Sequence, residues 1–389
     1  MSADVTRRNV LMGVGGAAFL GISAAVLPLF STPSKKQTPQ SCPSEDLSSS
    51  EKKLIISNWQ AYIDPFKKNP DATLNVFEEQ TGIDVTYTDD VTDNQEFFAK
   101  VVNQLGSCET VKRDMFMLTD WMASRMIELG WIQKLDHKNL PNVDKYLLPN
   151  LQDVAFDPGR EYSVPWQSGF TGIAYNADLV PEVRNFDELL NREDLKGRVT
   201  LLTEMRDTMG FMLKDVGADP TNFTDAQWDK AIELLSAARG RGQIRAFTGN
   251  EYTRDLAAGN IAACEAWSGD VIQLQFDNPK IKFVIPEEGL SLWSDNMMVP
   301  NLATHKTNAE AWMNYYYDPE VAAKLAAWVN YISPVVGAKE AMEKIDPSLV
   351  DNPLIFPTDD FLKNTFAFMP LSETQSKLYE RDFSNATGG

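Results

Sequence analysis

Aromatic and acidic side chains gather at four widely separated points of this 389-residue chain. A ring face attracts a cation through its quadrupole by about 0.5 to 2 kcal/mol, and a carboxylate accepts charge-assisted hydrogen bonds from an ammonium. These residue types therefore suit a solute that carries positive charge. The groups are Trp59 with Tyr62, Asp120 with Trp121, Trp267 with Asp270, and Trp293 with Asp295, and Tyr331 follows as a lone aromatic.

Each group taken alone has a plainer interpretation, because Trp and Tyr are common core residues and an acid often lies near one by chance. Their positions add weight, since several of the groups fall where an apolar run ends and a turn begins. Open α/β sheets place their ligands at such points. The apolar run 261–267 shows this best, because Ser268, Gly269 and Asp270 follow it directly. The sequence shows the types of these residues, whereas the fold decides whether the aromatic and acidic groups come together.

The elements that must position these residues alternate between strand and helix patterns. Residues 54–57 predict a strand and residues 58–62 a loop. Asp71 is expected to cap a helix, a half-buried strand follows over 83–87, and Asp120 is expected to cap a later helix. This alternation predicts an α/β fold.

Roughly 340 residues exceed the usual size of one hydrophobic core, so two lobes are expected. We place the first crossing between the lobes at 162–176, a loop at 289–295 and a return strand at 297–300. Lobe 1 then comprises 54–168 and 295–343, and lobe 2 comprises 169–294 and 344–389.

The start of the chain resembles a twin-arginine export signal. Arg7 and Arg8 precede the almost uncharged stretch 10–30, so residues 1–30 predict export to the periplasm or to the outer face of the cytoplasmic membrane. A stretch of about 20 apolar residues can also span a bilayer, which leaves an uncleaved anchor as the alternative. Residues 31–53 are rich in Ser, Pro, Lys and Gln and are expected to form a linker.

The chain is strongly acidic, with a formal net charge of -19. Residues 1–42 hold four basic residues and one acid, so the remainder carries -22. Such a field repels nucleic acid and attracts small cations, and no nucleic-acid partner is expected.

The three cysteines, Cys42, Cys108 and Cys264, allow at most one intramolecular disulfide, and the apolar surroundings of Cys264 favour structural burial. Lipidation of Cys42 is an alternative, although the residues before it lack the usual pattern.

The sequence offers little support for catalysis. His137 and His305 are the only histidines, neither lies beside a nucleophile motif, and both are expected at the surface. Zinc, redox and triad chemistry lack their residue patterns, so neither metal nor cofactor is expected. A secreted glycosidase is the enzyme alternative, because paired carboxylates with Trp platforms also describe a sugar-cleaving cleft.

Several segments together resemble the bacterial periplasmic spermidine/putrescine-binding proteins of ABC importers. The resemblance covers about 54–380 and implies a type II two-lobed fold, in which each lobe has a central sheet flanked by helices and the ligand cleft lies between them. It also implies a monomer that serves a permease in the cytoplasmic membrane. The segments are 57–62, 130–136, 161–166, 267–269 and 288–295.

The resemblance also implies how a polyamine would be held, with rings around its methylene chain and carboxylates at its amines. Asp295 would anchor an ammonium, the alternative being a helix or turn cap, and Trp267 and Trp293 would form apolar walls or belong to the core. The other implied contacts are Trp59, Tyr62, Thr119, Trp121 and Tyr331, and the aromatic and acidic groups add Asp120 and Asp270.

The chain departs from the family pattern at two places. The family's acid pair corresponds to Glu204 and Asp207 with a register uncertain by one residue, and Arg206 between them could neutralise one. Residues 366–368 are Phe-Ala-Phe, where the family often has a polar amide. These departures leave open a shorter diamine, another amine, or an opine-like or thiamine-like solute.

Overall fold

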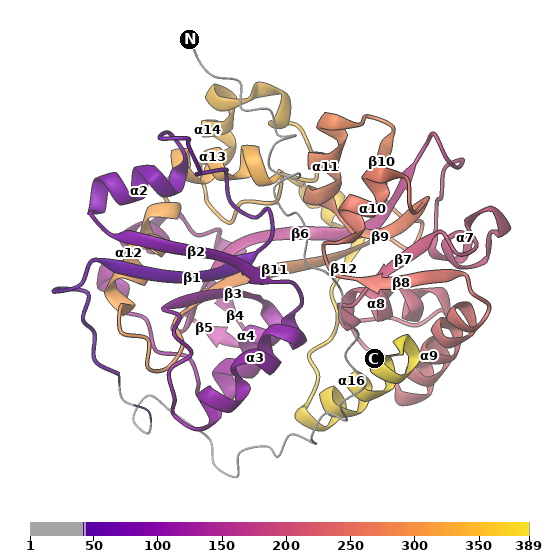
Figure 1. Ribbon diagram of the computed structural model, residues 1–389, viewed down its shortest axis with the longest axis horizontal. Coiled ribbons are helices and arrows are strands. Elements are labelled where there is room, and N and C mark those ends of the chain that lie inside the picture. Colours follow the sequence, from indigo (N-terminus) through magenta and orange to yellow (C-terminus); the bar gives the residue numbers. More distant parts are fainter. Residues whose placement is uncertain (1–41, 43, 389) are drawn as a thin grey trace.

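The structure is a computed structural model that describes residues 42 and 44–388. The predicted export signal, 1–30, and the first part of the predicted linker lie outside the described residues. Within the described part, none of the helices combines the length and the apolar character needed to cross a membrane. The molecule has two halves, one on each side of a central pair of long strands (Figure 1).

The first half, on the left of Figure 1, is built around three parallel strands with helices on both faces. Two caps differ from the prediction: α4 begins after Thr119, so Asp120 is its first residue, and α2 begins after Ala72 instead of Asp71. The elements are β1 (Lys53–Trp59), α2 (Thr73–Thr81), β2 (Asp84–Val91), α3 (Asn94–Gly106), β3 (Met115–Thr119), α4 (Asp120–Glu128), η1 (His137–Asn139), α5 (Pro141–Tyr146), α6 (Pro149–Gln152), β4 (Asp153–Val154), β5 (Asp157–Pro158), α12 (Lys306–Tyr316), α13 (Pro319–Val329), α14 (Ala338–Ile345) and η3 (Pro347–Leu349).

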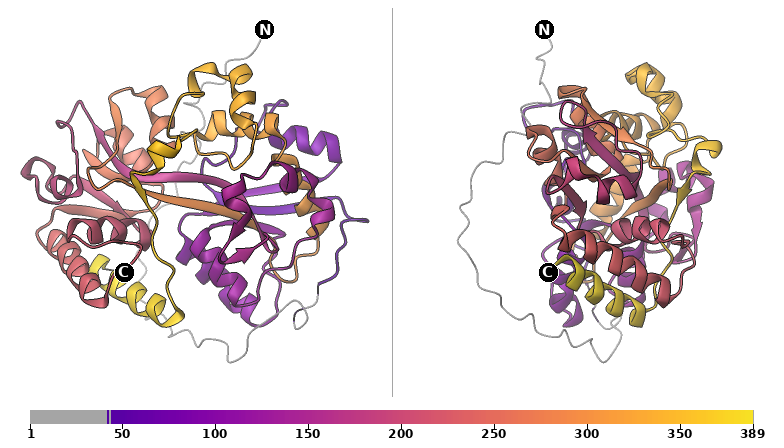
Figure 2. Two further views of the ribbon diagram at one scale, coloured as in Figure 1. Left: turned by 180° about the vertical axis from the view of Figure 1, so that it is seen from behind. Right: turned by 90° about the vertical axis from the view of Figure 1, so that its right-hand side faces the viewer.

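The second half, on the right of Figure 1, repeats this plan with β7 parallel to both β8 and β9. The C-terminal helix packs on α9 (Figure 2). At this contact the rings of Trp228 and Tyr379 stack with centroids 4.1 Å apart. The elements are α7 (Phe186–Asn191), η2 (Glu193–Leu195), β7 (Val199–Leu202), α8 (Met205–Asp215), α9 (Asp225–Gly240), β8 (Ile244–Thr248), α10 (Tyr252–Ala258), β9 (Ala263–Trp267), α11 (Ser268–Asp277), β10 (Ile281–Val284), α15 (Asp359–Leu362) and α16 (Glu373–Thr387).

Two long strands, β6 (Ser163–Asn176) and β11 (Leu290–Met298), run from one half into the other (Figures 1 and 2). They pair antiparallel with each other, β11 also pairs with β3, and β6 with β9 and β10. The strand order is β2-β1-β3-β11-β6-β9-β7-β8, with β10 on β6 and β12 (Thr365–Phe366) on β11. Ten of the described strands, from both halves, thus share one mixed sheet, and β4 and β5 form a separate pair.

The predicted loop at 289–295 is wrong, because residues 290–295 belong to β11. Strands on both sides of β11 leave few of its positions exposed, so its sequence lacks the alternation of a half-buried strand and its Ser and Asp residues suggest a loop. The correction matters because Trp293 and Asp295 are held by a central strand and therefore have little freedom to move.

Two large hydrophobic cores fill the molecule, and the first extends from the first half into β9 and α11 of the second. Leu54, Ile56 and Phe116 belong to the core around β1 and β3, whereas Phe186 and Phe211 belong to a second core with rings stacked at 4.0 Å. Cys264 is buried, as predicted. The residue boundaries proposed above for the lobes stay a prediction.

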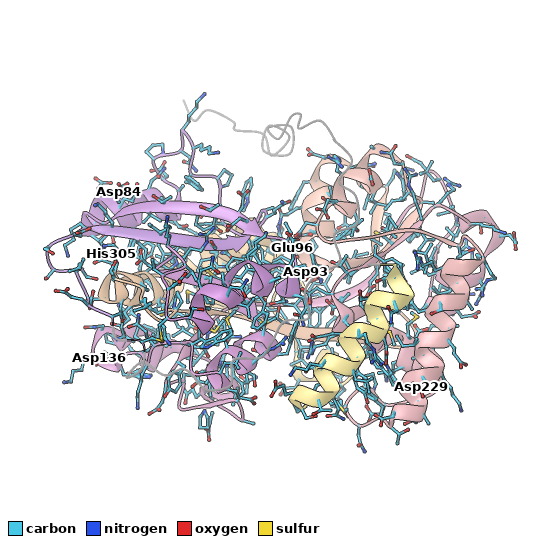
Figure 3. The ribbon with its side chains drawn as sticks, turned by 60° about the horizontal axis from the view of Figure 1, so that its bottom comes forward. Asp84, Asp93, Glu96, Asp136, Asp229 and His305 are labelled. Carbon is cyan, nitrogen blue, oxygen red and sulfur yellow. A yellow bond between two sulfur atoms is a disulfide. The ribbon has the colours of Figure 1, made fainter. Side chains whose placement is uncertain are left out.

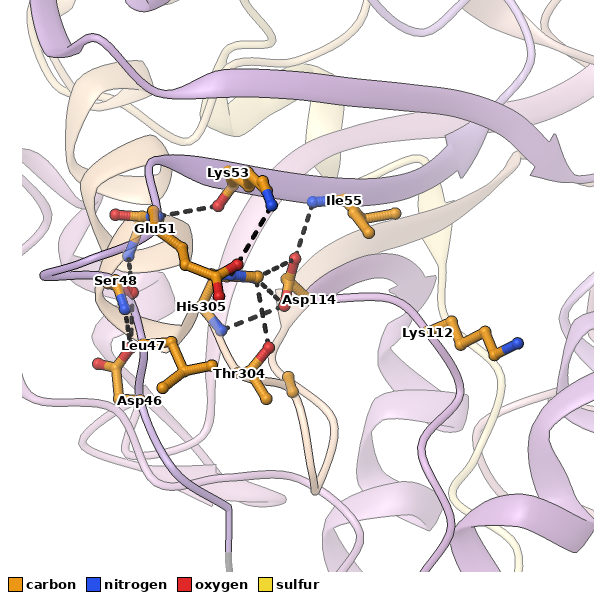
Figure 4. Close-up of polar contacts among 12 residues, drawn as sticks. Asp46, Leu47, Ser48, Glu51, Lys53, Ile55, Lys112, Asp114, Thr304 and His305 are labelled. Carbon is orange, nitrogen blue, oxygen red and sulfur yellow. Dashed lines mark hydrogen bonds and ion pairs between the residues drawn. The ribbon is translucent and has the colours of Figure 1, made fainter.

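The last part of the predicted linker is docked onto the first half rather than extended from it. Cys42 forms a disulfide with Cys108 and so has no free sulfur for a lipid. The amide of Leu47 donates to the carbonyl of Thr304 at 2.7 Å, and Asn308 Nδ2 donates to the carbonyl of Glu51 at 2.9 Å (Figure 4). These contacts give the polar segment partners that its composition does not reveal.

The prediction that both histidines lie at the surface is wrong for His305. Its ring is buried, and its Nδ1 atom lies 3.0 Å from Asp114 Oδ1. His305 directly precedes α12, at the place where the N-terminal segment crosses (Figures 3 and 4). His137 is only half-buried. Both histidines lie outside the set of cavity-lining residues described below.

Candidate functional site

A cavity of about 130 Å³ lies where the two halves meet. A single water needs only about 10 to 15 Å³ of such volume, so a small solute has room here. All twelve side chains named from the sequence as ligand contacts line this cavity. They are Trp59, Tyr62, Thr119, Asp120, Trp121, Glu204, Asp207, Trp267, Asp270, Trp293, Asp295 and Tyr331.

The topology of the sheet explains this convergence. Strands β1 and β3 are parallel, as are β7 and β9, so each half presents the carboxyl ends of its strands at one edge. Trp59 ends β1, Thr119 ends β3 and Trp267 ends β9, and all three line the cavity. Both sets of strand ends therefore face the same space, which β11 crosses.

The cavity walls are aromatic and join the two halves. Trp59 meets Trp267 edge-on with ring centroids 5.9 Å apart, and Tyr62 meets Tyr331 at 5.2 Å. Trp293 lies against Tyr331 at 5.4 Å. Edge-to-face contacts of this kind stabilise aromatic pairs by about 0.5 to 1.5 kcal/mol beyond the area they bury.

Two glycines make room for these rings. A Cβ atom on Gly169 would lie 2.5 Å from the Trp293 ring, and one on Gly269 would lie 2.5 Å from the Tyr331 ring. Both distances are below any van der Waals contact, so a side chain at either position would displace a wall of the cavity. The close approach therefore explains why glycine suits these two positions.

Asp295 lies in β11 directly opposite Thr119 of β3, and its Oδ1 accepts a hydrogen bond from Thr119 Oγ1 at 2.8 Å. This position in a strand excludes the alternative in which Asp295 caps a helix or turn. Burial raises the pKa of Asp295 to about 7, and the negative charges of Asp120 and Asp207 act in the same direction, against the hydrogen bond from Thr119 and the nearby Tyr62 hydroxyl. A carboxyl group in this state gains from an incoming cation.

The acid pair after β7, Glu204 and Asp207, lines the cavity. Both acids therefore belong to the cavity wall, whichever register relates them to the family pattern. Asp207 accepts hydrogen bonds from Trp267 Nε1 at 3.1 Å and from Thr171 Oγ1 at 2.8 Å, and burial raises its pKa. Glu204 Oε1 accepts from the amide of Asn94 at 2.7 Å and from Asn94 Nδ2 at 2.9 Å. Burial, reinforced by Asp93 and Asp207, raises the pKa of Glu204.

Asp270 is engaged by the protein itself at both of its oxygens. Oδ1 accepts from the Tyr331 hydroxyl at 3.0 Å, and Oδ2 accepts from Asn250 Nδ2 and the Tyr252 hydroxyl, both at 2.9 Å. Burial raises its pKa. The geometry thus gives Asp270 a clear part in orienting the Tyr331 ring.

Asp120 accepts a hydrogen bond from Asn296 Nδ2 at 2.6 Å through Oδ1. Burial raises the pKa of Asp120 to about 6, against the nearby Arg160 charge. It therefore adds a further weakly acidic carboxyl to the cavity wall.

Some lining residues went unnamed as ligand contacts in the sequence reasoning. Gln60, Ser291 and Leu292 fall inside segments that carry the family resemblance, so those segments held the signal. Asn250 follows the end of β8, a position that a strand-end search could have found. The remaining lining residues are Arg206, Ala367 and Phe368.

The lining is thus mostly acidic and aromatic, and Arg206 is its one basic residue among those described. Within the described part of the chain, His, Cys, Asp and Glu form no group of three or more that could hold a metal ion. Buried carboxyl groups beside ring faces suit an organic cation with apolar segments.

Comparison with known proteins gives a consistent picture. The model for bacterial extracellular solute-binding proteins matches residues 72–357. The spermidine/putrescine-binding periplasmic protein 1 of Haemophilus influenzae is 27% identical over 314 residues, which are 80% of this chain and 82% of that protein. The putrescine-binding periplasmic protein PotF of Escherichia coli is 29% identical over 364 residues, which are 88% of this chain and 93% of that protein.

Solved structures agree in fold. An ABC transporter protein from Listeria monocytogenes superposes with a TM-score of 0.76 at 29% identity, covering 86% of this chain and 99% of its own. The spermidine/putrescine ABC transporter substrate-binding protein PotD of Streptococcus pneumoniae gives 0.68 at 25% identity, covering 86% and 98%. The predicted two-lobed α/β fold is confirmed, with the refinement that the sheets of the two lobes are continuous through β6 and β11.

Proposed function

The chain belongs to the bacterial extracellular solute-binding proteins, and from this membership we propose that it captures a polyamine between its two halves for an ABC importer. The observation that carries the proposal is the convergence of five carboxyl groups and six Trp or Tyr residues on one cavity. Relatives named as putrescine- and spermidine/putrescine-binding proteins support the same ligand class.

The cavity offers each part of such a ligand a suitable partner. An ammonium near Asp295 and Asp207 would favour their ionised forms, which burial now disfavours. The methylene chain would be covered by the rings of Trp267 and Trp293, because burying each CH₂ contributes about 0.8 kcal/mol. Charge and apolar burial would therefore act together along the ligand.

Contacts between the halves support capture by closure. Glu204 of the second half accepts from Asn94 of the first, and Arg125 Nη1 lies 3.4 Å from Glu380 Oε1. Asp93 and Glu96 lie beside this junction at the start of α3 (Figure 3). A ligand that touches both halves stabilises the closed state, and a permease in the cytoplasmic membrane would then recognise that state.

The proposal involves binding and release of an unchanged solute by a monomer outside the cytoplasm, without catalysis and without a nucleic-acid partner. The acidic net charge of -19 supports attraction of a cation and repulsion of nucleic acid. The periplasmic names of the relatives support the location.

Calorimetric titration of the purified protein with putrescine, cadaverine, spermidine and spermine, beside an uncharged sugar, tests the proposal. We expect one-to-one binding of at least one amine and none of the sugar. Asp295→Asn should weaken that binding by about 2 kcal/mol or more, because it removes one partner of a buried charge pair. The matched control Asp229→Asn, on the exposed face of α9 and far from the cavity, should bind as the unaltered protein does (Figure 3). Equal affinity in the Asp295 variant, or binding of the sugar alone, would refute the assignment.

A further inference from the structure

Arg206 gives the cavity a property that cation binding alone does not explain. Its side chain is 9% exposed, and its guanidinium carbon lies 3.6 Å from the centre of the Trp121 ring and 5.9 Å from that of Phe368. Its Nε and Nη1 atoms are closed off from solvent and have no hydrogen-bond partner. A buried donor without an acceptor is destabilising, and the described residues supply no acceptor for these two atoms.

The negative charges that act on Arg206 are those of Glu204 and Glu380. Neither acid supplies the missing hydrogen-bond partner. Glu204 Oε1 accepts both hydrogen bonds from Asn94, and Glu380 pairs with Arg125. The guanidinium thus has two carboxyl groups and the Arg125 charge near it, but its Nε and Nη1 atoms donate no hydrogen bond within the described part. Because Arg206 lines the cavity and stacks on Trp121 there, a ligand that brings a hydrogen-bond acceptor to the guanidinium would supply the missing partner.

The charges around Arg206 restrict what that acceptor can be. An ammonium has donors and no acceptor, and it would stand beside a like charge. A carboxylate can accept, but the ionised form of Glu204 would repel it, and the Glu380 charge is already paired with Arg125. A neutral carbonyl oxygen accepts hydrogen bonds from a guanidinium without either conflict, and a small apolar substituent beside it would meet Trp121 and Phe368.

We propose that Arg206 makes the cavity selective for a linear amine that is cationic at one end and ends in a neutral acceptor, as in an N-acylated diamine. The inference rests on the proposed function, because Asp295 and Asp207 must hold the cationic end. Arg206 is then a specificity-determining residue of the cavity wall, beside Trp121, where it disfavours a further ammonium.

Titration calorimetry of the purified protein with N-acetylputrescine, putrescine, spermidine and 4-aminobutanoate tests this inference. We expect N-acetylputrescine to bind at least about tenfold more tightly than the other three, which corresponds to about 1.4 kcal/mol. Arg206→Met should remove this preference, whereas the control Arg381→Met, on the exposed face of α16, should retain it. The order of affinities in the unaltered protein tests the inference even if Arg206→Met fails to fold.

Three results would overturn the inference while leaving the proposed function intact. Putrescine or spermidine could bind as tightly as N-acetylputrescine, or Arg206→Met could weaken putrescine and N-acetylputrescine equally, which would indicate a structural role. Tightest binding of 4-aminobutanoate would show that the acceptor is anionic. Silence toward putrescine, spermidine and N-acetylputrescine alike would instead refute the proposed function.

Discussion

Amine binding should weaken as the pH falls from 8 to 5, because protons and the ligand's ammonium compete for the same buried carboxyl groups. Asp295 has a pKa of about 7, raised first by burial and then by Asp120 and Asp207. A bound ammonium favours the ionised form, so the ligand must displace whatever proton Asp295 carries. Amine affinity is therefore greatest above the pKa that Asp295 has in the ligand-free protein, and it falls below that pKa.

The magnitude follows from that pKa. For one carboxyl group titrating at about 7, affinity falls about twofold at pH 7 and about tenfold at pH 6, relative to the fully ionised protein, at 1.36 kcal/mol per pKa unit. Asp120, with a pKa of about 6, adds to the loss below pH 6. Below pH 6 the slope should thus be at least one decade per pH unit.

Calorimetry in buffers of different ionisation enthalpy measures both the affinity and the protons released. We expect about one proton released per amine bound near pH 6. Asp295→Asn should bind weakly at every pH and show a flatter profile, whereas Asp229→Asn should follow the unaltered protein. An affinity that stays constant between pH 5 and pH 7 in the unaltered protein would show that buried carboxyl groups do not hold the ligand's charge.

Three further predictions concern the cavity wall and the N-terminal segment. Trp293→Ala should cost about 1 to 3 kcal/mol of amine affinity through lost ring contact, measured by the same titration, and an unchanged affinity would place the ligand elsewhere. Gly269→Ala should displace Tyr331 and weaken amine binding by about tenfold, or about 1.4 kcal/mol. The control Gly240→Ala, whose Cβ meets nothing within 4 Å, should bind normally. Equal affinity in both variants would refute the close-packing argument. Replacing Cys42 and Cys108 by Ser should lower the free energy of unfolding by about 4 kcal/mol, as expected for a cross-link spanning 66 residues. Denaturant titration measures this change. A change below about 1 kcal/mol would show that the N-terminal segment stays docked without the disulfide.

The residues of the candidate cavity could be named from the sequence because their signals are local. Trp59, Thr119 and Trp267 each end an apolar run, and parallel strands of one half bring such ends to one edge. The resemblance to a known family reinforced Trp293 and Asp295 and added Glu204 and Asp207. Residue type and strand-end position therefore determined which side chains could form the site.

Other features depended on contacts between distant parts of the chain. The segment 290–295 reads as a loop but forms a strand because β3 and β6 flank it, and His305 is buried because Asp114 and the N-terminal segment cover it. Neither environment leaves a periodic pattern at the residue itself. Local propensity thus gave the wrong structure at 290–295 and the wrong exposure at His305.

The roles of the acids were likewise decided by tertiary structure. Sequence places Asp270 and Asp295 in the same class, yet Asp270 is bonded at both oxygens by Tyr331, Asn250 and Tyr252, whereas Asp295 accepts from Thr119 at Oδ1. Arg206 could be noticed in the sequence, but its stacking on Trp121 and its unpaired donors exist only in the folded cavity. The sequence by itself determined the chemistry available to this protein, and the packing of its two halves decided which groups remain free to use it, because hydrogen-bond partners and desolvation are set by residues far apart in the chain.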